Sequence, residues 1–333
     1  MMRIRCVNIL RQFSIAPVPH PLRIPYESHF FTTASGGFPM HAHILGPLGS
    51  RPLLFIHGLT TNSLNFPGVL RNLHHADGAI LIDVRGRGKS FVPDSSEPQQ
   101  TMQYMSRYRS LEDHASDLVA LMDSLSIEKC ILAGHSMGSF ISLYTCKLHP
   151  KRVAGAVLLD GGFPREAGKP GFDQDTTLGV ANAIKRLSKS FDSVEEYVAT
   201  RVLDVREVSA DMRQFYEYEL KRVGNAFRLR ASPEMINCDS EFMQSRFLTA
   251  KEMEEDISRD IPIGMVLAEM GFADGSPPMM RPDHVEAMKK ALQPVLVRKV
   301  NGANHYNVIT EDRFGKFTAQ FIQDFVQMSQ SRK

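Results

Sequence analysis

The sequence lacks any hydrophobic run of the roughly 18–20 residues needed to cross a bilayer. Its 333 residues carry a formal net charge of +2, so no broad basic field indicates a nucleic-acid partner. Its four cysteines show no CxxC or other metal-ligand spacing, which favours a reducing compartment. Internal repeats and low-complexity tracts are also missing. What remains is an ordinary globular composition, long enough for one large α/β domain or two smaller ones.

Residues 1–26 contain no acidic residue but several arginines. This composition, together with apolar residues at helical spacing and the sequence RQFS at 11–14, fits a mitochondrial transit peptide. A short basic arm is the alternative interpretation. Four prolines between positions 17 and 25 favour an extended linker. We therefore expect residues 1–27 to be an arm or transit peptide, and the protein to reside in the mitochondrial matrix or the cytoplasm.

Short apolar runs alternate with amphipathic segments from residue 51 onward. The apolar runs predict strands at 51–58, 129–136, 153–162 and 261–269, and also within 78–90, where the strand ends in a glycine- and arginine-rich loop, and within 294–305. Helical patterns separate them, at 66–75, 111–125, 137–150 and 282–292, and a last helical pattern occupies 310–328. Strands that alternate with helices in this way predict a mostly parallel sheet covered by helices on both faces.

The alternation stops between residues 163 and 260, where the pattern is helical and no strong strand is evident. We expect this block to be a helical cap inserted into a core formed by residues 28–162 and 261–333. Its aromatic and methionine side chains either hold the cap together or line a pocket for a hydrophobic acyl or ring substrate. They are Phe172, Phe191, Tyr197, Phe215, Tyr216, Tyr218, Phe227, Met235, Phe242, Met243 and Phe247.

The sequence ILAGHSMGSF at 131–140 places Ser136 between two glycines directly after an apolar run. A strand that turns sharply into a helix needs residues without bulk around the turn, and such a turn exposes the serine beyond the sheet edge. This pattern, G-x-S-x-G, predicts a nucleophile elbow. A serine hydroxyl needs a base to accept its proton. His305, in the loop VNGANHYNV after the last strand, is the candidate base, whereas His135 is expected to have a structural role.

Two further motifs, HGLTTN at 57–62 and DVRGRGKS at 83–90, precede the elbow. Together and in this order, the three motifs resemble those of the α/β-hydrolase family, over about residues 51–160 and 261–328. The resemblance implies that family's fold, with a mostly parallel sheet covered by helices. It also implies an oxyanion hole formed by the backbone N–H groups of Leu59 and Met137.

The acid of the implied triad is less clearly marked by the sequence. Most family members carry it after the strand at 261–269, but Gly271 stands at the usual position. A minority carries it directly after the strand that follows the elbow, where Asp160 ends the sequence LLDGG. We choose Asp160 as the acid, with Asp274 and Glu269 as the alternatives.

These residues predict a serine hydrolase that cleaves a carboxylic ester, thioester or lactone of a fairly hydrophobic small molecule. Ser136 would attack the carbonyl carbon, His305 would accept the serine proton, and the acid would orient the imidazole. No metal or cofactor is expected. The alternatives are a C–C bond hydrolase that uses the same triad, and a catalytically silent ligand-binding or partner-binding protein on this scaffold.

Overall fold

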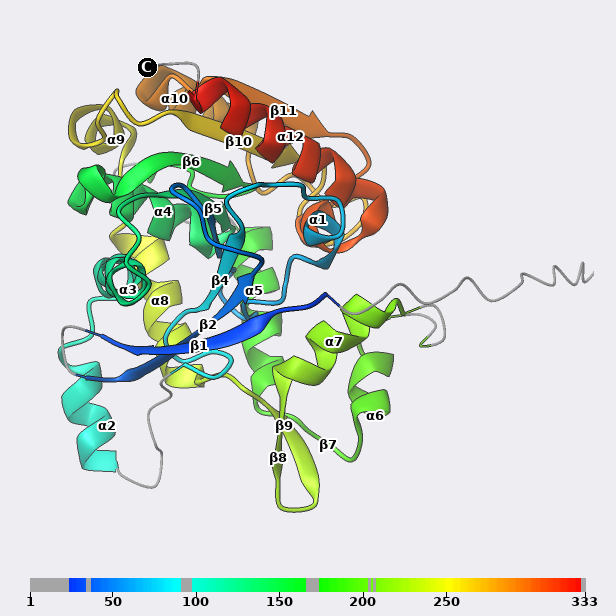
Figure 1. Ribbon diagram of the computed structural model, residues 1–333. Coiled ribbons are helices and arrows are strands. Elements are labelled where there is room, and N and C mark those ends of the chain that lie inside the picture. The colour runs from blue at the N-terminus through cyan, green and yellow to red at the C-terminus, as the bar shows by residue number, and fades with distance from the viewer. Residues whose placement is uncertain are drawn as a thin grey trace, which may run out of the picture.

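The computed structural model describes residues 24–33, 37–90, 98–165, 174–202, 205 and 208–330. Within these residues, one central sheet contains the strands β1 (Glu27–Thr32), β2 (Pro39–Leu45), β3 (Leu53–Ile56), β4 (Ala79–Asp83), β5 (Cys130–His135), β6 (Val153–Leu159), β10 (Ile263–Ala268) and β11 (Leu296–Val300). They pair in the order β1-β2-β4-β3-β5-β6-β10-β11 (Figure 1). Only the β1–β2 and β2–β4 pairings in this sheet are antiparallel. The predicted α/β fold with a mostly parallel sheet is therefore confirmed.

Helices cover both faces of this sheet (Figure 1). One face carries α3 (Leu111–Ser124), α4 (Met137–Leu148) and α10 (Pro282–Leu292), and the other carries α1 (Pro67–Leu70), α11 (Asn307–Thr310) and α12 (Asp312–Gln330). Strand β3 shows why its sequence is uniformly apolar. Leu54 and Ile56 join the core beneath α3 and α4, whereas Leu53 and Phe55 join the core beneath α1 and α12. A strand buried on both faces needs apolar residues at every position.

The antiparallel strands β1 and β2 were not expected from the sequence, where the first predicted strand began at residue 51. The sequence of β2 does not look like that of a buried strand, because the polar residues His41 and His43 occupy fully buried positions within it. Nδ1 of His41 lies 2.8 Å from a carboxylate oxygen of Asp83, and Nδ1 of His43 lies 2.9 Å from the Ser63 hydroxyl. Buried polar groups are tolerated when they are hydrogen-bonded in this way, so the apolar pattern was broken without loss of the strand.

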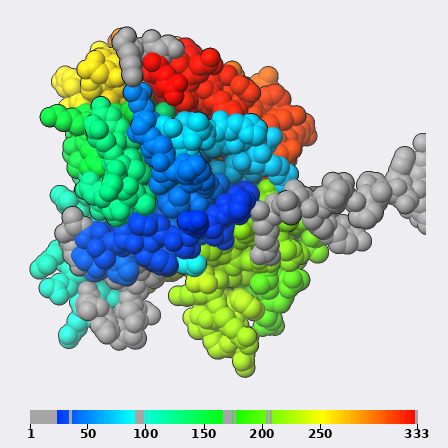
Figure 2. Space-filling model, viewed as in Figure 1, coloured from blue at the N-terminus to red at the C-terminus, as the bar shows by residue number. Residues whose placement is uncertain are grey.

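Residues 174–260 contain the helices α5 (Gln174–Leu187), α6 (Val194–Ala199), α7 (Ala210–Glu219), α8 (Pro233–Ser245) and α9 (Ala250–Asp256). They also contain the strands β7 (Ser190–Phe191), β8 (Leu220–Val223) and β9 (Ala226–Leu229), which form a small antiparallel sheet. The sequence showed no strong strand in this block, and the structure adds these three short strands to its helices. The missed signal is the Gly224–Asn225 turn of a β8–β9 hairpin, in which Gly224 has φ +61°. This hairpin protrudes from the molecular surface (Figure 2).

The N-terminal expectations concern residues that the structure describes only in part. Residues 1–23, which include most of the predicted transit peptide, lie outside the described residues, as does Phe172 of the expected cap. The carbonyl oxygen of Ile24 accepts a 3.3 Å hydrogen bond from the side-chain amide of Gln214. The first described residue is therefore in contact with α7. No helix within the described ranges combines the length and apolar character that a membrane crossing requires.

Candidate active site

Ser136 occupies the sharp turn between β5 and α4, with φ 54° and ψ −119°. A residue that carries a side chain is strained in this conformation, and such strain commonly marks functional sites. The flanking glycines are required by close contacts. A Cβ atom at Gly134 would lie 2.1 Å from the carbonyl oxygen of Gly138, and one at Gly138 would lie 2.0 Å from that of Ile56. The turn thus leaves the Ser136 side chain partly exposed at the end of the sheet.

His305 lies in the loop after β11, and its ring Nδ1 donates a 2.7 Å hydrogen bond to Oδ2 of Asp160. Asp160 follows β6 with φ 47° and is fully buried. Its Oδ1 accepts a 3.0 Å hydrogen bond from the backbone N–H of Ala268. Both carboxylate oxygens therefore have a partner, which is the condition for keeping a carboxylate in the interior. The contact fixes the tautomer of His305 that leaves Nε2 available as an acceptor.

The alternative acids do not contact His305. Oδ1 of Asp274 accepts a 2.8 Å hydrogen bond from the side-chain amide of Asn304. Glu269 accepts a 2.7 Å hydrogen bond from the Gly302 N–H and also pairs with a lysine at the surface. A Cβ atom at Gly271 would lie 2.4 Å from the carbonyl oxygen of Pro277, so that position is closed to a side chain. The Gly271 carbonyl oxygen instead accepts the backbone N–H of His305 at 2.8 Å.

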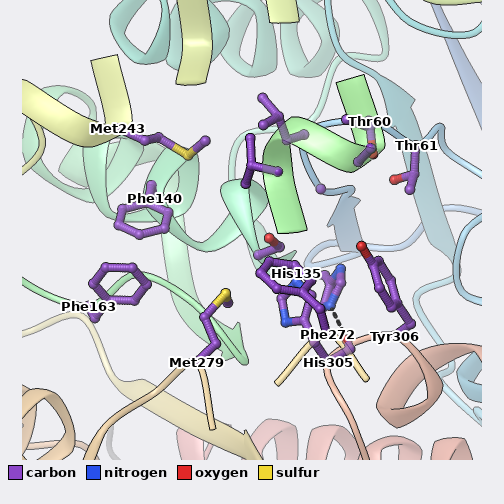
Figure 3. A pocket seen from close by; sticks show the side chains of 15 residues that line it. Thr60, Thr61, His135, Phe140, Phe163, Met243, Phe272, Met279, His305 and Tyr306 are labelled. Carbon is purple, nitrogen blue, oxygen red and sulfur yellow. Dashed lines mark hydrogen bonds between the residues drawn. The ribbon is translucent and has the colours of Figure 1, made fainter. Parts of the chain in front are cut away.

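Ser136 and His305 face the same cavity, but they are not hydrogen-bonded to each other in the part of the chain that the structure describes. Catalytic hydrogen bonds are often long or poorly aligned before substrate binds. His135 supports the His305 loop from beneath, because its Nε2 donates a 2.8 Å hydrogen bond to the His305 carbonyl oxygen (Figure 3). Burial, and then the His305 charge, hold the pKa of His135 well below its ordinary value, so His135 is a neutral donor.

The segment that carries Leu59 is held beside Ser136 by two side chains. Nε of Arg87 donates a 2.9 Å hydrogen bond to the Leu59 carbonyl oxygen. Nδ1 of His57 lies 2.7 Å from the Gly58 carbonyl oxygen, while its Nε2 accepts the N–H of Val84 at 3.1 Å. A Cβ atom at Gly58 would come within 3.7 Å of the Ser136 hydroxyl oxygen, which shows how close this backbone passes to the serine.

Leu59 follows β3, and Met137 is the first residue of α4. Among the described residues, no hydrogen bond uses the backbone N–H of either one. The N–H at the start of a helix has no intrahelical partner and is available to an anionic oxygen. The two N–H groups predicted as oxyanion donors are thus both uncommitted, on the two segments that flank Ser136.

The cavity above Ser136, which we call the serine cavity, has a volume of about 40 Å³. Most of its lining is apolar or aromatic: Gly58, Leu59, Thr60, Thr61, His135, Ser136, Phe140, Phe163, Val180, Ala183, Met243, Phe272, Met279, His305 and Tyr306. Figure 3 shows Phe140, Phe163 and two methionines on one side, with Thr61 and Tyr306 on the other. The described part of the chain contains no group of three or more side chains suited to hold a metal ion.

Of the cap side chains considered from the sequence, Met243 lines the serine cavity, and Phe215 and Tyr216 line a second cavity beside it. The sequence prediction missed Phe140, although a signal existed. Phe140 stands four residues after Ser136, so the two share one face at the start of α4. Phe272 and Met279 come from an irregular loop after β10, where no periodicity marks which side chains turn inward.

Comparison with known proteins gives the same fold as the one that the sequence motifs imply. The sequence profile described as "alpha/beta hydrolase fold" matches residues 51–192. An sn-1-specific diacylglycerol lipase ABHD11 from Danio rerio is 36% identical over 113 residues, covering 33% of this chain and 32% of that protein. Its Mus musculus counterpart is 23% identical over 296 residues, covering 86% of this chain and 88% of that protein.

A 2-(acetamidomethylene)succinate hydrolase from Mesorhizobium japonicum is 31% identical over 156 residues, covering 46% of this chain and 50% of that protein. The chain thus spans a third to a half of the length of the Danio and Mesorhizobium relatives. The crystal structure of E-2-(acetamidomethylene)succinate hydrolase aligns with a TM-score of 0.68 at 20% identity, covering 91% of this chain and all (100%) of that one. This structural likeness shows the fold.

Proposed function

Because this chain has the α/β-hydrolase fold, we propose that it is a serine hydrolase of carboxylic esters, thioesters or lactones. One observation carries the proposal. Ser136 stands on a strained turn at a cavity it shares with His305, and His305 is hydrogen-bonded at 2.7 Å to the buried Asp160. A nucleophile, a base and an acid that orients the base are the parts that acyl transfer requires.

In this proposal the Ser136 hydroxyl attacks the substrate carbonyl carbon, and Nε2 of His305 accepts its proton. Asp160 keeps the imidazole in the required tautomer and stabilises its charged form. The backbone N–H groups of Leu59 and Met137 stabilise the negative oxygen of the tetrahedral intermediate, at about 3 kcal/mol for each donor. His305 then protonates the leaving atom, and a water molecule activated by the same imidazole releases the acyl group.

The apolar side of the serine cavity supports a hydrophobic group on the substrate. A relative named as a diacylglycerol lipase acts on a lipid ester, which agrees with this preference. We propose that the group held by Phe140, Phe163, Met243 and Met279 is the acyl chain. The small volume of the cavity, about 40 Å³, requires these side chains or α5 to move when a long chain enters.

A panel of esters, thioesters and lactones of increasing acyl length tests the proposal, with Ser136→Ala as the control. We expect hydrolysis by the wild type and a loss of several orders of magnitude in the variant. Retained activity in Ser136→Ala would overturn the serine mechanism. A wild type that cleaves none of these substrates would leave the alternative functions considered from the sequence.

We also propose that residues 163–260 act as a cap over a core formed by residues 28–162 and 261–333. The support is a set of contacts between the two parts. Gly88 N–H donates to the Arg230 carbonyl oxygen at 2.9 Å, and Arg87 pairs with Asp239 on α8 at 2.6 Å.

For the basic residues before Glu27 we keep import into the mitochondrial matrix as the proposal and cytoplasmic residence as the alternative. Imaging of fusions with and without residues 1–26 tests it.

A further inference from the structure

A second, larger cavity opens beside the serine cavity and has a volume of about 760 Å³. Thr61 and Tyr306 line both cavities, so the two spaces adjoin at these residues. The second space is rich in charge. Its lining includes four arginines and two acids: Arg71, Arg186, Arg201, Arg313, Glu311 and Asp312. We call it the arginine cavity.

Two of the arginines are already accounted for by other contacts. Arg71 forms an ion pair of 2.5 Å with Asp211 and a longer one of 3.7 Å with Asp312. Arg313 is exposed to solvent, and its guanidinium lies 4.8 Å from the centre of the Phe314 ring. Neither of these arginines therefore presents an uncompensated charge in a dry environment.

Arg186 and Arg201 differ from those two. Within the described residues, neither forms an ion pair with a carboxylate, and the Nε atom of each is buried without a hydrogen-bond partner. The Arg201 guanidinium does contact an aromatic ring, since it lies 6.0 Å from the centre of the Tyr216 ring. Glu219 is the carboxylate whose charge attracts both, but it is fully buried and accepts a hydrogen bond from the Tyr197 hydroxyl. Two guanidinium groups thus share one carboxylate. Both arginines are half-buried and line the cavity, so a further negative charge placed between them would be stabilised.

The pKa shifts of these groups show that their charges affect one another. Burial, and then repulsion by the Arg201 charge, lower the pKa of Arg186. Burial also raises the pKa of Glu219, whereas the charge of Glu219 is among the causes that raise the pKa of Arg201. An arginine guanidinium presents a planar fork of N–H donors that matches a carboxylate or a phosphate.

Helix α5 connects the two cavities along one face. Val180, Ala183 and Arg186 follow one another at intervals of three residues, so their side chains lie on the same side of the helix. The first two line the serine cavity and the third lines the arginine cavity. A single ligand that lies along this face therefore passes from an apolar environment to a cationic one.

We propose that Arg186 and Arg201 bind an anionic group, a carboxylate or a phosphate, on the leaving-group side of the ester or thioester that Ser136 attacks. This inference rests on the proposed function. His305 must deliver its proton to the leaving atom, and Tyr306, its neighbour in the chain, lines the arginine cavity. In the step, the carbonyl carbon–oxygen or carbon–sulfur bond breaks, the serine ester forms, and the serine proton leaves on the anionic alcohol or thiol.

The test uses hexanoyl esters of three short alcohols: propanediol, hydroxypropanoate and hydroxypropyl phosphate. They share one acyl chain, and they differ in whether the leaving alcohol is neutral, a carboxylate or a phosphate. We compare kcat/KM of the full-length wild type with that of Arg186→Gln and Arg201→Gln. The ratio of variant to wild type for each ester cancels the ester's intrinsic reactivity. Arg213→Gln is the matched control, because Arg213 lies on α7, pairs with Glu195 and lines neither cavity.

We expect each variant to lose about tenfold or more in kcat/KM toward at least one anionic ester, because a charge-assisted hydrogen bond is removed. The neutral ester should change by less than about twofold, and Arg186→Lys should recover part of the loss. The ester that loses most identifies whether the site prefers carboxylate or phosphate. Turnover of the neutral ester shows that a variant is folded. Should Arg201→Gln fail to fold, the half-buried Arg186 carries the test alone.

Two failures are distinguishable in this experiment. If the wild type cleaves the neutral ester but the variants lose activity equally on all three esters, or on none, the anion site is overturned while the serine hydrolase proposal stands. If a folded wild type cleaves none of the esters, the proposed function is overturned and this inference falls with it.

Discussion

Asp160 and His305 lie 145 positions apart in the sequence and are joined by a 2.7 Å hydrogen bond between Oδ2 and Nδ1. The bond is formed in the interior, where Asp160 is fully buried and His305 nearly so. Because the backbone N–H groups of Ala268 and His305 are also bound, by Asp160 and Gly271 respectively, the imidazole is held from two sides. This relationship supports the proposal that Asp160, after the strand that follows the elbow, is the acid of the triad.

Replacement of Asp160 by asparagine is expected to keep the fold and to lower kcat by up to about 10⁴-fold, because the amide favours the wrong imidazole tautomer. Steady-state kinetics on an ester cleaved by the wild type measures the loss. Asp274→Asn is the matched control, since Asp274 is hydrogen-bonded to Asn304 at the surface and its replacement should change kcat little. A larger loss in Asp274→Asn than in Asp160→Asn would contradict the assignment.

Replacement by alanine should affect mainly catalysis at Gly58 and mainly stability at Gly138, two glycines near the elbow. In Gly58→Ala the new Cβ would lie 3.2 Å from Cβ of Ser136 and 3.7 Å from its hydroxyl oxygen. We expect a fall in kcat of about 10- to 100-fold with a small change in stability, because the nucleophile is displaced.

In Gly138→Ala the new Cβ would lie 2.0 Å from the Ile56 carbonyl oxygen, and a backbone atom cannot move aside. This variant should be severely destabilised in thermal unfolding before any question of catalysis arises. Equal effects of the two variants on both stability and kcat would count against the geometry of the turn.

Because His57 is buried, we expect the free energy of unfolding to fall as the pH is lowered. Burial is the main cause that lowers its pKa from 6.5 to about 4, although the nearby Asp83 acts in the opposite direction. Between these pH values the unfolded chain binds a proton at His57 and the folded chain does not, so unfolding becomes more favourable as the pH falls. The full effect is on the order of 3 kcal/mol and is absent above pH 6.5.

Urea unfolding of wild type and His57→Gln at several pH values checks this expectation. Glutamine can retain a donor and an acceptor but takes up no proton, so the variant should lose stability less steeply between pH 6.5 and pH 4. His74→Gln, at an exposed position, is the control and should follow the wild type. Parallel curves for all three proteins would refute the role of His57.

Arg87 should be important for stability because its ion pair with Asp239, at 2.6 Å, is fully buried. Arg87→Met leaves the Asp239 charge without this partner and is expected to reduce the free energy of unfolding by about 3–5 kcal/mol. Arg109→Met removes a mostly exposed arginine from a 3.2 Å pair with Asp113 and should change it by less than about 0.5 kcal/mol. Similar values from denaturant unfolding would show that the buried pair does not stabilise the fold.

The parallel strands and the elbow could be predicted because their signals are local. An apolar run marks each of β3, β4 and β5. The glycines around Ser136 are required because a Cβ atom there would collide with the backbone close to the turn. The hairpin of β1 and β2 could not be predicted by the same rule, because His41 and His43 occupy its buried positions. Their burial depends on partners that fold from elsewhere in the chain, including Asp83 and Ser63.

The cavities were the least predictable feature for a similar reason. Arg186 lies on α5 and Arg201 follows α6, and nothing in the sequence distinguishes either from an ordinary surface arginine. The fold brings both of them, together with Tyr306, to the lining of one cavity. By contrast, the position of Asp160 at a strand end made it a candidate, although the sequence offered no distance with which to choose it over Asp274.

The central claim is that Ser136 is the nucleophile, and covalent labelling tests it most directly. A fluorophosphonate probe is added to the full-length protein, which is then digested and analysed by mass spectrometry. We expect the label on Ser136 in the wild type, none at this position in Ser136→Ala, and a much slower reaction in His305→Ala. Folded wild-type protein that remains unlabelled, or that carries the label on another residue with equal speed in Ser136→Ala, would contradict the account.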